Sequence, residues 1–173
     1  MTHEPRFLGN LKLEQRDDID PSGKTWELLE DLGFLRKDGI LVIGEKGATT
    51  DGASIPILLQ RIIGLPIQDK YAAPATLHDG GYRKNKPVVL IDMNKTCGLD
   101  AEVVMAVWRD LPNLRDCQKE CKCDCFIHAE TMSRRFWDET FDQGNRVKGV
   151  TDWKRRVVFR AVCMFGWKPY EEK

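Results

Sequence analysis

Residues 77–83 read Leu-His-Asp-Gly-Gly-Tyr-Arg, inside a stretch whose residue pattern predicts a helix. The chain has three histidines, and His78 is the one that the pattern places in the middle of a helix, beside a carboxylate and a phenol. Tyr82 follows four residues later on the same helix face, and Asp79 points roughly 100° around the helix. Gly80-Gly81 costs about 1 kcal/mol per glycine relative to alanine, so we expect another backbone or a substrate to approach closely there. A half-buried histidine satisfied by the protein itself is the structural alternative.

The pattern around this stretch predicts an α+β fold. Residues 1–56 are expected to form a small β-rich layer, with a buried strand at 40–43 and a loop at 45–54. Apolar residues at helical spacing predict core helices within 57–86 and 126–170. Segment 87–125 reads as a Cys-rich insertion between them. The expected helices run over about 56–63, 72–83, 101–108, 126–141 and 152–165.

Length and charge narrow the class of protein. A chain of 173 residues and 19.9 kDa suits a single domain, 1–173, with a core of its own. Lys+Arg and Asp+Glu both number 27, so the net charge is +0, and we expect no nucleic-acid partner. The N-terminus lacks a secretory profile and no apolar run is long enough to span a membrane, so we expect synthesis in the cytoplasm as a soluble product.

Six cysteines are many for a cytosolic chain, and four of them lie close together before a histidine. Thiolates and imidazole suit zinc, although the C-x-C-x-C spacing is not that of a zinc finger. Disulfides from this cluster to Cys97 or Cys163 are the rival interpretation, and free thiols in a reducing cell are the third. The candidate ligands are Cys117, Cys121, Cys123, Cys125 and His128.

Four sequence features, in order, resemble those of a family common in tailed bacteriophages and prophages. Residues 50–56 read Thr-Asp-Gly-Ala-Ser-Ile-Pro, matching T-D-x-A-S-I-P, and His78 to Tyr82 matches H-D-x-x-Y. Asp138 to Phe141 matches the later D-x-x-F, and a closing basic-aromatic helix ends in Phe165-Gly166. The resemblance implies a phage protein, synthesised in the host cytoplasm and incorporated into the virion.

The pairing of H-D-x-x-Y with a later D-x-x-F also resembles the core of secreted phospholipase A₂. That resemblance implies that His78 acts as general base, that Asp138 holds its far ring nitrogen, and that Tyr82 donates to the Asp138 carboxylate. It implies Ca²⁺ at Asp79. The candidate substitute for the calcium loop of those lipases is residues 50–54, where the Asp51 carboxylate is a further oxygen donor or else a turn or capping residue. The sequence departs from those lipases because their glycine-rich calcium loop and bracing cysteines are absent.

Two functions of different classes follow. The first is a phage hydrolase acting on phospholipid esters, with the phospholipid membrane as partner. The second is a non-catalytic virion component of the tail, neck or capsid, in contact with other virion proteins and crosslinked through cysteines. The basic helix predicted at 152–165 has two interpretations. Its cations could bind an anionic membrane surface or DNA. Alternatively, the apolar residues from Trp153 to Phe165 pack in the core and the cations form a solvated face.

Overall fold

The structure of the protein is a computed structural model, and it describes residues 3–18, 25–50, 69–82, 88–96, 98–110 and 124–165. Two antiparallel sheets are formed within these ranges. The larger has the order β1-β4-β5-β7-β8 and the smaller the order β2-β3-β6. The strands of the larger sheet are β1 (Arg6–Leu8), β4 (Leu32–Leu35), β5 (Ile40–Gly44), β7 (Val88–Asp92) and β8 (Phe126–Ile127). Those of the smaller are β2 (Leu13–Gln15), β3 (Trp26–Leu28) and β6 (Thr49–Thr50).

Four α-helices lie in the described ranges, with three short 3₁₀ segments beside them. Ser133 caps the third of these helices, because its hydroxyl accepts a hydrogen bond from the Phe136 amide at 3.3 Å. The α-helices are α2 (Ala72–Tyr82), α3 (Ala101–Asp110), α5 (Arg134–Val147) and α6 (Asp152–Phe165). The 3₁₀ segments are η1 (Asp69–Tyr71), η2 (Met93–Lys95) and η3 (Ala129–Thr131).

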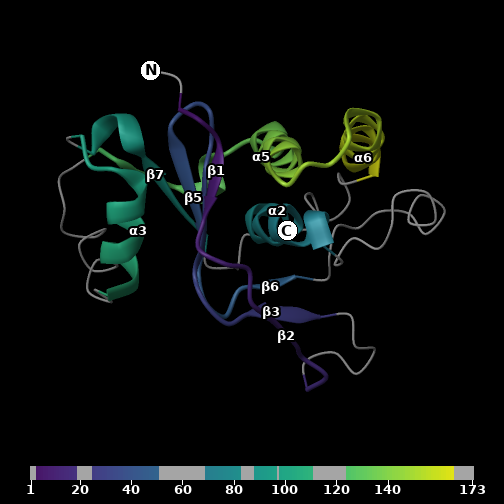
Figure 1. Ribbon diagram of the computed structural model, residues 1–173, viewed down its shortest axis with the longest axis horizontal. Helices are drawn as coiled ribbons and strands as arrows, with labels where there is room; N and C mark the ends of the chain where they lie inside the picture. Colours follow the sequence, from purple (N-terminus) through teal and green to yellow (C-terminus); the bar gives the residue numbers. More distant parts are fainter. Residues whose placement is uncertain are drawn as a thin grey trace.

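The larger sheet separates two helical layers. Figure 1 shows α3 on one side of the sheet, and α2, α5 and α6 on the other. Successive strand residues face opposite sides, so Leu41 and Ile43 pack with the α3 side and Val42 packs with α2 and α5. Strand β5 is therefore covered on both faces, which explains why Ile40–Gly44 is a continuous run without charged or polar side chains.

This architecture confirms the α+β class but corrects the predicted insertion. Residues 88–92 form strand β7, which pairs along its length with β5, and α3 covers a face of the sheet. Residues 88–96 and 98–110 thus contribute a strand and a helix to the core. The predicted helix 126–141 was also wrong at its start, because Phe126 and Ile127 pair with β7 and the helix begins at Arg134. Thr49–Thr50, expected in a loop, pairs with β3.

The predictions for 40–43, 72–83, 101–108 and 152–165 are confirmed to within two residues at each end. The expected helix at 56–63 lies outside the described residues. Gly39 turns the chain between β4 and β5 with φ of 83°, a conformation that favours glycine.

The two glycines of α2 serve packing rather than ligand approach. A Cβ at Gly81 would lie 2.0 Å from Cδ2 of Trp137, and one at Gly80 would lie 2.5 Å from a methyl group of Val88. Trp137 is fully buried at this contact. The space predicted for a substrate is therefore filled by the indole of α5, which brings α2 and α5 close together.

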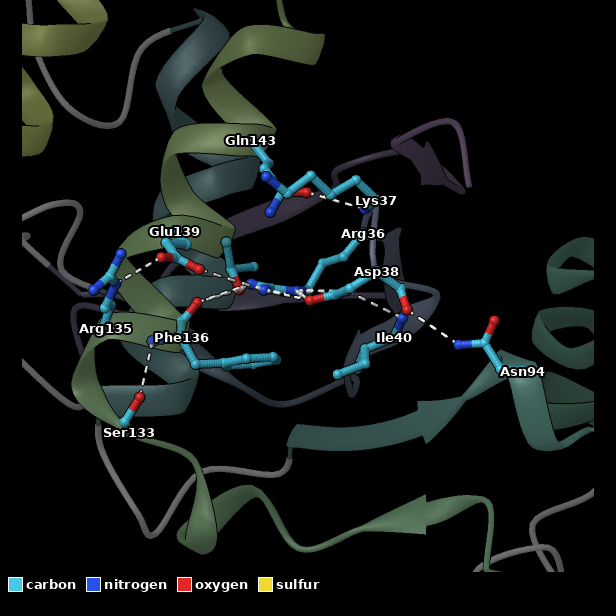
Figure 2. A network of polar contacts seen from close by, with 11 residues as sticks. Arg36, Lys37, Asp38, Ile40, Asn94, Ser133, Arg135, Phe136, Glu139 and Gln143 are labelled. Atoms are coloured by element: carbon cyan, nitrogen blue, oxygen red, sulfur yellow. Dashed lines mark hydrogen bonds and ion pairs between the residues drawn. The ribbon is translucent and has the colours of Figure 1, made fainter. Parts of the chain in front are cut away.

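Arg36, at the end of β4, fixes α5 against the sheet. Its side chain is 3% exposed, donates to the carbonyl of Phe136 at 2.9 Å and to the Thr140 hydroxyl, and pairs with Asp38 at 2.7 Å. Its guanidinium also lies 3.9 Å from the Phe136 ring centroid. Figure 2 shows this network joining the β4–β5 turn to one face of α5. The helix that carries Asp138 is thereby held in a fixed position.

Candidate functional site

The contact between α2 and α5 brings together three residues predicted for the site. Nε2 of His78 lies 3.1 Å from Oδ1 of Asp138, although the two residues are 60 positions apart. The Tyr82 hydroxyl donates to the same carboxylate oxygen. The His78 and Tyr82 rings stack with centroids 4.0 Å apart, as their i, i+4 spacing on one helix face allows. One carboxylate oxygen thus orients both α2 side chains.

The second oxygen of Asp138 faces two groups that sequence reasoning missed. Arg134 Nε lies 3.6 Å from Oδ2, one helical turn before Asp138 on α5. The Cys163 thiol of α6 donates to the same oxygen at 3.5 Å. Arg134 also donates to the backbone carbonyl of Cys163. The i, i+4 spacing of Arg134 and Asp138 was a usable signal, whereas the contact from α6 required the tertiary structure.

The other ring nitrogen of His78 faces Asp79. Nδ1 is buried and has no hydrogen-bond partner among the described residues. It lies 3.6 Å from Oδ1 of Asp79, beyond a normal hydrogen bond but close enough for charge attraction. Thr50 of β6 donates to Oδ2 of Asp79 at 2.5 Å. The motif that begins at Thr50 is therefore joined to α2 through Asp79, a link that the order of the two motifs did not reveal.

Burial and charge set the protonation of this cluster. His78 is 5% exposed and Asp138 3% exposed, so the imidazole lies away from bulk water in this conformation. Burial disfavours the imidazolium, but the carboxylates of Asp138 and Asp79 outweigh it and raise the pKa of His78 above its ordinary value. Burial acts against the Asp138 carboxylate, yet its hydrogen bonds from His78 and Tyr82 lower the pKa of Asp138. The geometry therefore extends the imidazolium–carboxylate pair to higher pH than an isolated histidine would allow.

The neighbouring groups remain protonated at neutral pH. Burial and the Asp138 carboxylate raise the pKa of Tyr82 well above its ordinary value. The same two causes, burial first, raise the pKa of the Cys163 thiol to about 11. Both groups are consequently donors to Asp138, and Cys163 is a thiol rather than a reactive thiolate.

The structure brings a limited donor set to the predicted calcium site. Asp79 contributes a carboxylate near the Thr50 hydroxyl, whereas Ca²⁺ takes six to eight oxygen ligands. Asp51 lies outside the described residues. Within the described ranges, no group of three or more His, Cys, Asp or Glu side chains is placed to hold a metal. The described residues therefore do not complete a calcium site, and no catalytic step is assigned to the ion.

The cysteine cluster is described in part. Cys117, Cys121 and Cys123, like Cys97, lie outside the described residues. Cys125 is buried in the core with α3, and His128 is exposed just before η3. Cys163 is a free thiol against Asp138, so in this structure it does not form the disulfide that was one of the three alternatives for the cysteines. Among the helices of the described residues, none is long and apolar enough to cross a membrane.

Comparison with known proteins assigns a family. Residues 26–162, which contain both α2 and α5, match the family described as "Protein of unknown function (DUF1353)". The "Uncharacterized protein y4iH" of Sinorhizobium fredii is 40% identical over 60 residues. That alignment covers 34% of this chain and 25% of the relative, so the matched part spans a quarter of the relative's length. No solved structure matches the chain. The chain belongs to the DUF1353 family.

Proposed function

We propose that the cluster of His78, Asp138 and Tyr82 is the general-base site of a phospholipid ester hydrolase of the phospholipase A₂ type. The observation that carries this proposal is the asymmetry of the imidazole: Nε2 is held by Asp138 at 3.1 Å, while buried Nδ1 has no hydrogen-bond partner in the described structure. A histidine that is hydrogen-bonded through one nitrogen, and makes no hydrogen bond at the other within the described ranges, is suited to take a proton from water.

The reaction follows from these roles. Neutral Nδ1 accepts a proton from water as the water oxygen adds to the ester carbonyl carbon. The resulting imidazolium is stabilised by the Asp138 carboxylate, which Tyr82 orients. The bond from the carbonyl carbon to the alcohol oxygen then breaks, and the proton on Nδ1 passes to the leaving oxygen. The products are a fatty acid and a lysophospholipid, and His78 returns to its neutral form.

Two consequences distinguish this site from an exposed base. The imidazole is 5% exposed, so the side chains around it must move for a substrate to reach Nδ1. The neighbouring carboxylates raise the pKa of His78, so we expect the acidic limb of the pH–rate profile above the ordinary histidine value of about 6.5.

The test is hydrolysis of mixed-chain phospholipid by purified protein, with Ca²⁺ and, separately, with a chelator. His78→Gln should lower the rate by about 10²–10⁴-fold, the usual contribution of a general base. Tyr82→Phe, which removes a single hydroxyl, should lower it less. His128→Gln is the matched control, because His128 is exposed and outside the cluster. Absent activity in the wild type, or equal rates in wild type and His78→Gln, would refute the hydrolase.

A structural virion role is the second candidate, and the burial of the cluster favours it. His78, Asp79 and Asp138 are each at most 6% exposed and connect α2 to α5, as a purely structural polar contact would. The order of the two phage-type motifs supports a tailed-phage or prophage origin and assembly with other virion proteins after synthesis in the host. Mass spectrometry of purified particles tests this candidate, and consistent absence of the chain from them would exclude it.

A further inference from the structure

The outer face of α6 is exposed and carries an unusual combination of side chains. Trp153 is 54% exposed and Met164 is 65% exposed, although the sequence pattern placed both in a core stripe. Arg156 and Arg160 are also exposed, and they lie between the two apolar residues along the helix. Spacings of three, four and four residues place all four side chains on one face. We call these four residues the α6 outer stripe.

The cations of this stripe have no acidic partner among the described residues. The acids close to α6 are instead used by Arg155, which pairs with Asp142 at 2.5 Å and with Asp152 at 3.3 Å. Arg156 and Arg160 border a hollow of about 420 Å³ together with Trp153, Val157 and Asp152. Two guanidinium groups that lack an ion-pair partner in the described part of the chain, and lie beside a hollow, are suited to bind phosphate oxygens.

We infer that the α6 outer stripe docks the protein on a membrane surface containing anionic phospholipid. The arginines match the negative headgroups, and the exposed indole and thioether are side chains that enter the interfacial region of a bilayer. Duplex DNA would also attract the arginines, but it offers little to the apolar ends of the stripe, Trp153 and Met164.

The stripe is connected to the candidate site through the same helix. Cys163, on the inner side of α6, donates to Asp138, and Arg134 of α5 binds the carbonyl of Cys163. Docking α6 on a bilayer would hold the His78–Asp138 pair about one helix diameter, roughly 10 Å, behind the docked face. The biological purpose of this surface therefore rests on the proposed lipid hydrolysis, whereas its binding can be measured without any turnover.

The experiment is co-sedimentation with vesicles of phosphatidylcholine alone or of phosphatidylcholine mixed with phosphatidylglycerol. Wild-type protein should bind the anionic vesicles and not the neutral ones. Arg156→Gln with Arg160→Gln should weaken the partition coefficient about 30-fold, from about 1 kcal/mol for each basic residue. Lys37→Gln with Lys46→Gln is the matched control, because it removes two exposed cations outside α6 and should have little effect.

Trp153 supplies an independent reading of the same docking. Its fluorescence should shift to the blue on anionic vesicles, and Trp153→Phe should lose that shift, while thermal unfolding checks that each variant is folded. Equal binding to both vesicle types, equal losses in the two double variants, or binding to duplex DNA without binding to vesicles would overturn the inference. Vesicle binding without hydrolysis would refute the proposed function alone, and hydrolysis of phospholipid without vesicle binding would refute the docking surface alone.

Discussion

Asp138→Asn is the substitution that separates a buried ionic cluster from ordinary helix packing. It preserves the shape of the side chain and removes its charge. The carboxylate accepts hydrogen bonds from His78 and Tyr82 on Oδ1, and faces Arg134 and Cys163 on Oδ2. An amide retains one acceptor oxygen but presents N–H donors to the other side, where the Cys163 thiol donates and the Arg134 guanidinium lies 3.6 Å away.

The magnitude follows from these contacts. Hydrogen bonds to a charged group contribute about 1.5–3 kcal/mol and neutral ones about 1, so weakening the two bonds on Oδ1 costs about 1 kcal/mol each. Leaving Arg134 and the thiol without an acceptor on Oδ2 adds about 1 kcal/mol or more. We expect Asp138→Asn to lower the free energy of unfolding by about 2–4 kcal/mol.

Urea unfolding followed by circular dichroism measures this loss as a change in midpoint at an unchanged slope. Asp142→Asn is the control, because Asp142 lies on the same helix and its carboxylate pairs with Arg155 at 2.5 Å with the side chain 26% exposed. A partly exposed ion pair contributes about 1 kcal/mol or less. Equal losses in the two variants, or a loss below about 1 kcal/mol for Asp138→Asn, would refute the claim that Asp138 holds the cluster together.

Three further predictions concern pH, packing and the Arg36 network. The pKa of His78 is higher in the folded than in the unfolded protein, so protonation of His78 stabilises the fold; this stabilisation is complete below the unfolded pKa of about 6.5 and is lost as the pH rises through the folded pKa. The free energy of unfolding of wild type minus that of His78→Gln should therefore shrink with rising pH. A difference that grows with pH would contradict this. Gly81→Ala should destabilise the protein by about 1–3 kcal/mol in thermal unfolding, because its Cβ would strike the buried Trp137 indole, and a stabilised variant would show that the contact is absent. Arg36→Gln should lower the free energy of unfolding in urea by about 3 kcal/mol or more. Arg135→Gln is the control, because its side chain is 85% exposed, and it should lower that free energy by less than about 0.5 kcal/mol. Similar losses in the two variants would show that the Arg36 network does not fix α5.

The local signals in the sequence located the helices that carry the site. The residue pattern around His78 predicted α2, and the apolar spacing in 152–165 predicted α6. The pairing of His78 with Asp138 came from resemblance to another protein family. No local pattern contains it, since it depends on how α2 and α5 pack across 60 positions of chain.

The errors arose where pairing partners are distant in the chain. Residues 88–91 form a continuous apolar run, but the role of strand β7 beside β5 depends on a segment nearly 50 positions earlier. Phe126 and Ile127 looked like the first turn of a helix for the same reason, whereas Ser133 was a readable N-cap. Trp153 recurs at helical spacing with core residues, yet the face of α6 that contacts α5 is centred on Val158 and Val162.

¹⁵N NMR of the His78 ring tests whether this imidazole is held by the Asp138 carboxylate of another helix. A pH titration in the wild type should give a His78 pKa above about 6.5. Above that pKa the proton should remain on Nε2, facing Asp138, and Asp138→Asn should lower the pKa. An ordinary His78 pKa that is unchanged in Asp138→Asn, or a neutral ring that carries its proton on Nδ1, would contradict the account.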